Sequence, residues 1–150
     1  MRAGHLVSVC AVLGMVQFPP LAAAQQAPVV PKWAKDFLQS WYAVYNAGDA
    51  AGVASLFTAD GTLGPDKGRA AIAAGLEKAF AATRYRCEGK FDGLRELNGL
   101  AAAWGVETCT ETPKSKGQPV TTKERWLIVF EHQADGKWLI LRETWEDLKP

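Results

Sequence analysis

The sequence has 150 residues, of which 17 are Lys or Arg, 16 are Asp or Glu and two are His. This length suits one domain with one hydrophobic core. The charge is nearly balanced and no basic run occurs, so the composition argues against nucleic acid or an anionic membrane surface as the partner.

Residues 1–24 are predicted to be a cleavable signal peptide. Arg2 supplies a positive start, residues 6–16 form an apolar run too short to cross a membrane, and the alanines at 22–24 fit the small-residue cleavage rule. An uncleaved membrane anchor is the alternative. Residues 25–31 are expected to be a flexible leader and 32–150 the domain. The protein is then periplasmic or secreted, without membrane contact after cleavage.

Three helices are predicted in the first half of the domain. Apolar residues recur at helical spacing over 32–47 and again over 69–82. Asp49 is expected to cap a short helix between them. The apolar side of that helix is expected to carry three residues, Val53, Leu56 and Phe57. Asp60-Gly61 is then expected to turn the chain, and residues 64–68 to form a tight loop.

Four strands are predicted after Thr83, where the apolar period changes from helical to alternating. They fit about 84–96, 100–112, 120–133 and 137–147, joined in two places by the hairpin turns Asn98-Gly99 and Asp135-Gly136. Helices followed by an antiparallel meander predict an α+β fold, with three N-terminal helices packed on the sheet.

The first hairpin predicts a disulfide. If residues 97–99 form a three-residue loop with Gly99 left-handed, Glu96 faces Leu100 and Cys87 falls opposite Cys109. An exported protein meets oxidising conditions, which favour the Cys87–Cys109 bond over two free thiols. Two cysteines without histidine partners do not indicate a metal site, and no cofactor is expected.

The last hairpin predicts which side chains meet the helices. With Asp135-Gly136 as a two-residue turn, one face is mostly apolar. That face pairs Trp126, Ile128, Phe130 and His132 with Trp145, Glu143, Leu141 and Leu139, respectively. The other face sets Arg125 against Glu146 and Arg142 diagonally to Glu131, which suits a solvated or dimerising surface.

Four motifs occur in order along the domain. They are Tyr-Asn-Ala-Gly-Asp at 45–49, Leu-Phe-Thr-Ala-Asp at 56–60, Gly-Arg-Ala-Ala-Ile at 68–72 and the stretch 135–145. In this order they resemble the NTF2-like superfamily, in its SnoaL-like, DUF4440-type and ketosteroid-isomerase-like branches. The resemblance implies a curved sheet wrapped over a long helix, a pocket at the open end, and homodimers formed through the sheet.

The resemblance also implies where catalytic residues would stand. Ketosteroid-isomerase-like enzymes use a first-helix tyrosine as donor, and its position here is Trp41. Their catalytic aspartate corresponds to about Pro65, with Asp66 beside it, while their last-strand tryptophan matches Trp145. Indole is a poorer acid than a phenol, so isomerase chemistry is not supported.

Glu143 is the candidate catalytic residue. On the apolar face, desolvation would raise the pKa of its carboxyl, as a general acid or base requires. The alternative is a solvated carboxylate or one paired with Arg84 or Arg86. The expected pocket residues are Trp41, Tyr45, Phe57, Asp60, Trp126 and Trp145. Glu107 and Glu111 share the face of Cys109, and the sequence leaves open whether that face lines the pocket. His132 is expected to pack at a sheet edge.

The predicted function is an exported domain that binds a small apolar or amphipathic molecule in an aromatic-lined pocket, as a homodimer. One alternative is an isomerase, cyclase or dehydratase that uses Glu143 with Trp41 or Tyr45 as donor. The other alternative is an interaction module that works through the face of its sheet.

Overall fold

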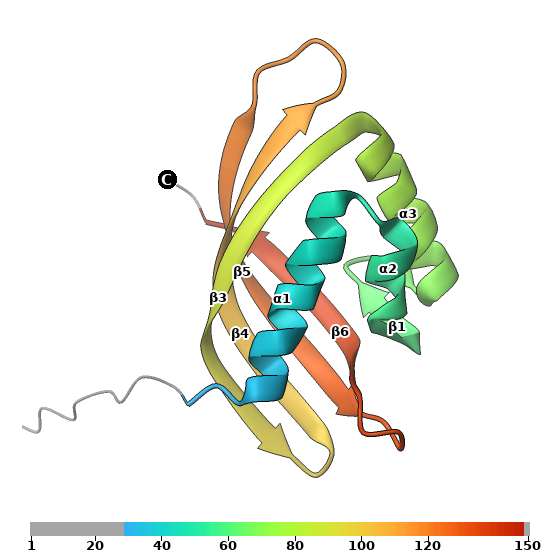
Figure 1. The fold of residues 1–150 in the computed structure, drawn as a ribbon, viewed down its shortest axis with the longest axis vertical. Coiled ribbons are helices and arrows are strands. Elements are labelled where there is room, and N and C mark those ends of the chain that lie inside the picture. Colours follow the sequence, from blue (N-terminus) through green and yellow to red (C-terminus); the bar gives the residue numbers. More distant parts are fainter. Residues whose placement is uncertain (1–28, 149–150) are drawn as a thin grey trace, which may run out of the picture.

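The computed structural model describes residues 29–148 (Figure 1). The predicted signal peptide and most of the predicted leader lie outside these residues. Three helices form, as expected: α1 (Lys32–Ala47), α2 (Ala50–Ser55) and α3 (Arg69–Ala82), although two strands lie between α2 and α3. The strands are β1 (Phe57–Leu63), β2 (Asp66–Lys67), β3 (Thr83–Leu97), β4 (Leu100–Pro113), β5 (Val120–His132) and β6 (Trp138–Asp147). No helix in this part of the chain is long and apolar enough to cross a membrane.

The caps explain where the first two helices end and begin. Gly48 adopts φ 71°, a left-handed conformation, and its N–H donates to the carbonyl of Tyr45, which closes α1. The Asp49 carboxylate accepts a hydrogen bond of 2.8 Å from the N–H of Gly52, which caps α2 as predicted.

The six strands form one sheet in the order β2-β1-β6-β5-β4-β3, so the fold is α+β. The sheet is not wholly antiparallel, because β1 runs parallel to β6. The expected placement of Phe57 in the second helix and of Asp60-Gly61 in a turn is wrong. Phe57 is the first residue of β1, where it is fully buried and pairs with Ile140, and Asp60-Gly61 lies within this irregular strand.

The β3–β4 hairpin forms the predicted disulfide through a different register. Asn98 and Gly99 both have positive φ and make a two-residue turn, so Leu97 rather than Glu96 pairs with Leu100. A bulge between Phe91 and Gly93 then shifts the pairing by one residue. The two differences cancel: Cys87 pairs with Cys109, and their sulfur atoms are 2.05 Å apart.

The β5–β6 hairpin has the predicted register only in the part that lies away from its turn. Trp126 pairs with Trp145 and Ile128 with Glu143, as expected. A bulge between Val129 and Phe130 then places Ile140, not Leu141, opposite Phe130, and Trp138, not Leu139, opposite His132. The bulge turns the fully buried Ile140 into the core.

The predicted contacts of the charged residues in this hairpin are confirmed in one case and wrong in another. The predicted Arg125–Glu146 ion pair is present at 3.5 Å. Arg142 donates to the carbonyl of Asp60 at 3.3 Å, so its predicted partner Glu131 is not the group it contacts. The His132 ring lies 4.7 Å from the Trp138 ring at the end of the sheet.

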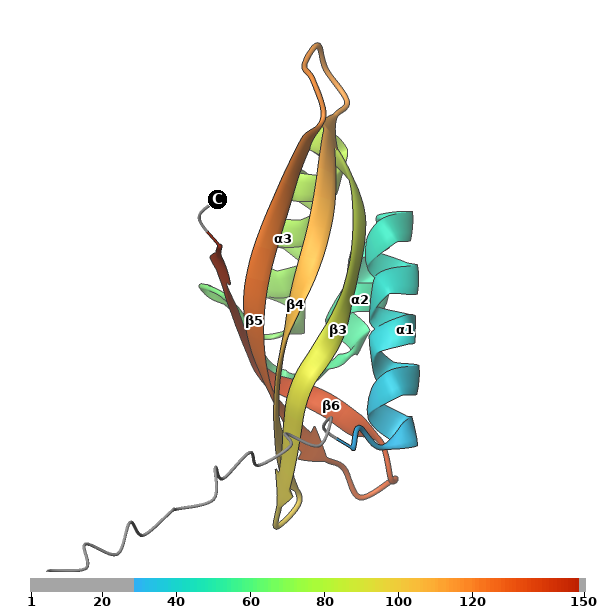
Figure 2. The ribbon, with the colours of Figure 1, turned by 90° about the vertical axis from the view of Figure 1, so that its left-hand side faces the viewer.

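The long strands bend around the helices, which lie against one face of the sheet (Figures 1 and 2). The largest fully buried side chains come from helices and strands alike: Phe57, Phe130, Ile72, Ile140 and Val53. Trp33 at the start of α1 stacks on Trp138 at 4.5 Å and meets Phe130 edge to face. The core therefore fills the end of the sheet where α1 begins, and the opposite end stays open.

Candidate functional site

The inner face of β4 changes in character along its length. Ala101 and Ala103 are fully buried against the helices, whereas Glu107 and Glu111 follow on the same face beyond Gly105. On the neighbouring strands the same end of the inner face carries Glu124, Glu143 and Trp145. One end of the sheet thus packs the core, and the other end presents carboxyl groups.

These groups surround an open cavity of about 290 Å³. Four aromatic side chains form part of its wall: Trp41 and Tyr45 from α1, Tyr85 from β3 and Trp145 from β6. The Trp41 and Tyr45 rings lie nearly parallel at 5.7 Å, and Tyr45 meets Tyr85 at 5.5 Å. Trp145 is 45% exposed, which places it at the rim. The cavity is therefore lined, not filled, by tryptophan.

Glu143 is the most buried carboxyl group of the cavity. The residue is only 8% exposed, and its Oε2 atom has no hydrogen-bond partner within residues 29–148. Burial, with added repulsion from Glu107, raises the pKa of Glu143 well above its usual range. Arg84 and Arg86 are exposed and form no ion pair with it, so the alternative of a paired carboxylate is wrong.

Glu107 lines the same cavity as Glu143 and is hydrogen-bonded to a residue of α1. The Tyr42 hydroxyl donates a hydrogen bond of 3.0 Å to Glu107 Oε2. Gly89, which pairs with Glu107 across the hairpin, makes this possible, because a Cβ there would collide with the Tyr42 hydroxyl. Burial raises the pKa of Glu107 to about 7, although the hydrogen bond from Tyr42 acts in the opposite direction.

The remaining carboxyl groups complete an acidic lining. Burial raises the pKa of Glu124, which accepts a hydrogen bond from Thr122 at 3.1 Å. Asp66 from β2 extends its carboxylate over Gly75 of α3, where any side chain would collide with it. A carboxyl group with a pKa of about 7, such as Glu107, is present in both forms near neutral pH and can therefore give up or take up a proton, as a general acid or base must.

The sequence-predicted site residues divide into two groups. Trp41, Tyr45, Glu143 and Trp145 line the cavity. Phe57 and Trp126 lie in the core, where the Trp126 ring covers Gly105. Asp60 is exposed on β1 and accepts a hydrogen bond of 3.1 Å from Thr58.

Sequence reasoning missed Glu124, Tyr85 and Tyr42. Asp66 and Pro65, which the resemblance placed at the position of the catalytic aspartate, both line the cavity. Strand alternation carried one step beyond Trp126 places Glu124 on the inner face, and alternation from Cys87 does the same for Tyr85. No local pattern identifies Tyr42, because its contact depends on a glycine on another element.

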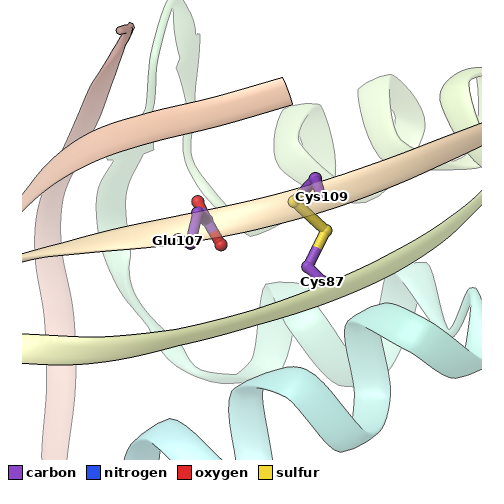
Figure 3. Close-up of side chains that lie close together, drawn as sticks. All are labelled: Cys87, Glu107 and Cys109. Carbon is purple, nitrogen blue, oxygen red and sulfur yellow. A yellow bond between two sulfur atoms is a disulfide. The ribbon is translucent and has the colours of Figure 1, made fainter. Parts of the chain in front are cut away.

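The disulfide lies in the floor of the site, next to Glu107 (Figure 3). The sulfur atoms of Cys87 and Cys109 and a carboxylate oxygen of Glu107 lie within 4.8 Å of one another, a spacing that could hold a metal ion. Because the two sulfurs are bonded to each other, neither is a thiolate ligand. In this state the disulfide serves to join β3 to β4.

The fold matches several solved structures. A ketosteroid isomerase-like protein from Erwinia carotovora atroseptica aligns with a TM-score of 0.71 at 18% identity, covering 79% of this chain and 95% of that one. A proposed scytalone dehydratase from Novosphingobium aromaticivorans aligns at 0.70 and 14% identity, covering 78% and 83%. A protein from Xanthomonas campestris, described as a calcium/calmodulin dependent protein kinase II association domain, aligns at 0.64 and 26% identity, covering 77% and 85%.

Among proteins of curated function, none matches this chain. The family model of the SnoaL-like domain matches residues 38–140, from the middle of α1 to β6. This range contains most of the cavity wall but ends before Glu143 and Trp145. The chain therefore belongs to the SnoaL-like domain family, within the NTF2-like superfamily.

Proposed function

We propose that this protein is an exported small-molecule-binding domain whose ligand occupies the cavity between α1, α3 and the open end of the sheet. The observation that carries the proposal is a buried carboxyl, Glu143, without a hydrogen-bond partner in an aromatic-walled cavity. Burying such a group unpaired costs on the order of 1–3 kcal/mol. A ligand that satisfies it recovers this free energy on binding.

The position of the cavity supports the same proposal. Pockets that take small molecules are concave, mostly aromatic or apolar, and carry a few polar groups that fix orientation. Trp41, Tyr45 and Tyr85 supply the apolar wall, and Glu107 and Glu143 supply the polar groups. Export is supported by the signal-like residues 1–24 and by the disulfide, which is typical of oxidising compartments.

A ligand screen with a blocked cavity tests the proposal. Thermal shift with apolar and amphipathic metabolites should give stabilising hits for the wild type, because a ligand that binds only the folded state raises the unfolding temperature. Ala79→Phe, which fills the cavity from α3, should abolish these shifts. Ala81→Phe, on the exposed side of the same helix, should keep them. Hits that survive Ala79→Phe would contradict binding in the cavity.

An acid–base enzyme is the second candidate, favoured by two carboxyl groups of one cavity, Glu107 and Glu143, whose pKa values are both raised. A carboxylic acid held protonated near neutral pH can deliver a proton to a substrate, with Tyr45 or Trp41 as an additional donor. Isomerase or dehydratase substrates should then be converted by the wild type, as followed by mass spectrometry, but not by Glu143→Gln. Equal conversion by both proteins would exclude Glu143 as the catalytic residue.

The outer face of the sheet is proposed as the dimer surface and, in the third candidate function, as the working surface of an interaction module. Trp104 on β4 and Leu127 on β5 are cross-strand partners that are 39% and 44% exposed. Adjacent exposed apolar side chains favour association. Analytical ultracentrifugation should show a dimer for the wild type and a monomer for Trp104→Lys. A monomeric wild type would contradict the proposal.

A further inference from the structure

The charged residues that line the cavity are all acidic. None of the residues that line it is Lys, Arg or His. Five of them carry carboxyl groups: Asp66, Glu107, Glu111, Glu124 and Glu143. The ion pairs found within residues 29–148 involve three other acids, Asp36, Asp135 and Glu146. Within the described residues, carboxyl groups therefore gather around the cavity, and no basic side chain lines it.

One of these groups is directed at the cavity without any partner. Glu143 lines the cavity, is more than nine-tenths buried, and leaves Oε2 without a hydrogen bond in the described chain. Glu107, on the inner face of β4, already accepts a hydrogen bond from the Tyr42 hydroxyl at one of its two oxygens. Burial raises the pKa of Glu143, and a cation bound beside it would lower that pKa again and so ionise the carboxyl group. The resulting charge-assisted hydrogen bond is about twice as strong as one from a neutral donor. The missing partner is therefore best supplied by a cation.

The aromatic wall distinguishes an organic cation from a metal ion. Trp41, Tyr45 and Tyr85 present ring faces and edges to the same space, and such rings attract a cation through their quadrupoles. The carboxyl groups are also too dispersed for a metal. In the part of the chain that the structure describes, the one close group of three candidate ligands contains the two disulfide-bonded cysteines.

We propose that the ligand of this cavity is a protonated organic amine with an aromatic or aliphatic body, a proposal that rests on the proposed binding function. The ammonium group donates hydrogen bonds to Glu143 and Glu107. The apolar body lies against Trp41 and Tyr45. A cavity of about 290 Å³ with an open rim limits the ligand to a small molecule.

Three probes of similar shape and different charge test the inference: phenethylamine, 2-phenylethanol and phenylacetate. Their binding to the disulfide-bonded protein is measured by isothermal titration calorimetry at about pH 8, where Glu107 is mostly ionised. Phenethylamine should bind about tenfold more tightly than 2-phenylethanol, because its ammonium group donates a charge-assisted hydrogen bond where the alcohol donates a neutral one. Phenylacetate should bind more weakly than 2-phenylethanol.

Variants identify the carboxyl group that binds the ammonium group of phenethylamine. Glu143→Gln should weaken phenethylamine about tenfold and leave 2-phenylethanol within about twofold, because only the ionic contact is lost. The matched control is Glu77→Gln, an exposed carboxylate on α3 away from the cavity, which should change neither affinity. If Glu143→Gln fails to fold by circular dichroism, Glu107→Gln serves as the second variant, and the charge series on the wild type still decides the question.

Several outcomes would overturn the inference. Equal affinity for phenethylamine and 2-phenylethanol, or tighter binding of phenylacetate, would show that the cavity does not select a cation. Such results would leave the proposed binding function intact. Displacement of phenethylamine by calcium chloride at matched ionic strength would instead indicate an inorganic cation. Absence of binding by all three probes would also reject the amine, and the metabolite screen would then decide the binding function separately.

Discussion

Replacing Glu107 by Gln separates the charge of this residue from its hydrogen bond. The amide oxygen of glutamine can still accept from the Tyr42 hydroxyl, which donates to Glu107 at 3.0 Å. In the folded wild type, burial raises the pKa of Glu107 from 4.5 to about 7. The folded state therefore binds this proton more tightly than the unfolded chain does. The contribution of Glu107 to the free energy of unfolding is therefore fully present below pH 4.5 and is lost as the pH rises through about 7.

The size of the effect follows from the two pKa values. At about 1.4 kcal/mol for each pH unit, moving the pKa of Glu107 from 4.5 to about 7 costs the folded state about 3 kcal/mol once the carboxyl is ionised. Glu107→Gln lacks this cost. The free energy of unfolding of the variant, relative to the wild type, should therefore increase by about 3 kcal/mol between acidic pH and about pH 8.

Urea unfolding followed by tryptophan fluorescence measures this difference at several pH values between about 4.5 and 8. Glu77→Gln is the control, because its side chain is exposed on α3 and lies outside the cavity. The reasoning would be refuted if the difference between Glu107→Gln and the wild type stayed constant over this range. That result would mean that Glu107 ionises as it does in the unfolded chain.

Three further changes test the framework around the site. Replacing Cys87 and Cys109 by Ala should lower the free energy of unfolding by about 3 kcal/mol in urea titrations, because the bond closes a loop of 22 residues; an unchanged midpoint would contradict this. Asp49→Ala should remove the cap of α2 and cost about 1 kcal/mol, measured in the same way, and a loss below experimental error would show that the cap is not needed. Gly89→Ala should displace the Tyr42 hydroxyl and lower the midpoint of thermal unfolding, at a cost of about 1–3 kcal/mol; wild-type stability would mean that the hairpin relaxes around the new methyl group.

The long elements could be predicted from the sequence to within a residue or two. Their signals are local: helical spacing for α1 and α3, alternation for β3 to β6, and Asn98-Gly99 for the first turn. β1 could not be predicted, because its partner β6 lies more than 70 residues away and Asp60-Gly61 has the composition of a turn. Tertiary pairing overrides that local preference.

The two bulges show a second limit. A bulge adds one residue to a strand and reverses the alternation beyond it, and no local residue type requires this. In β6 the bulge turns Ile140 inward, where its N–H also donates to the carbonyl of Leu56 at 2.8 Å. In β3 the bulge lets Phe91 pack against Trp126 at 5.2 Å. Packing against other elements decides both registers.

The sequence by itself determined the helices, the long strands and the inward direction of Glu143 through short-range periodicity, and the order of its motifs indicated the family. It also indicated the Cys87–Cys109 pair, although the bulge in β3 that restores this pairing belongs to the tertiary structure. Only the tertiary structure decided what Glu143 meets. Carboxyl groups from β2, β4, β5 and β6 converge with aromatic rings from α1 and β3 on one cavity. Burial raises the pKa of both Glu107 and Glu143, with added repulsion from Glu124 on Glu107 and from Glu107 on Glu143. Burial and repulsion depend on distances that arise only when the sheet bends around the helices.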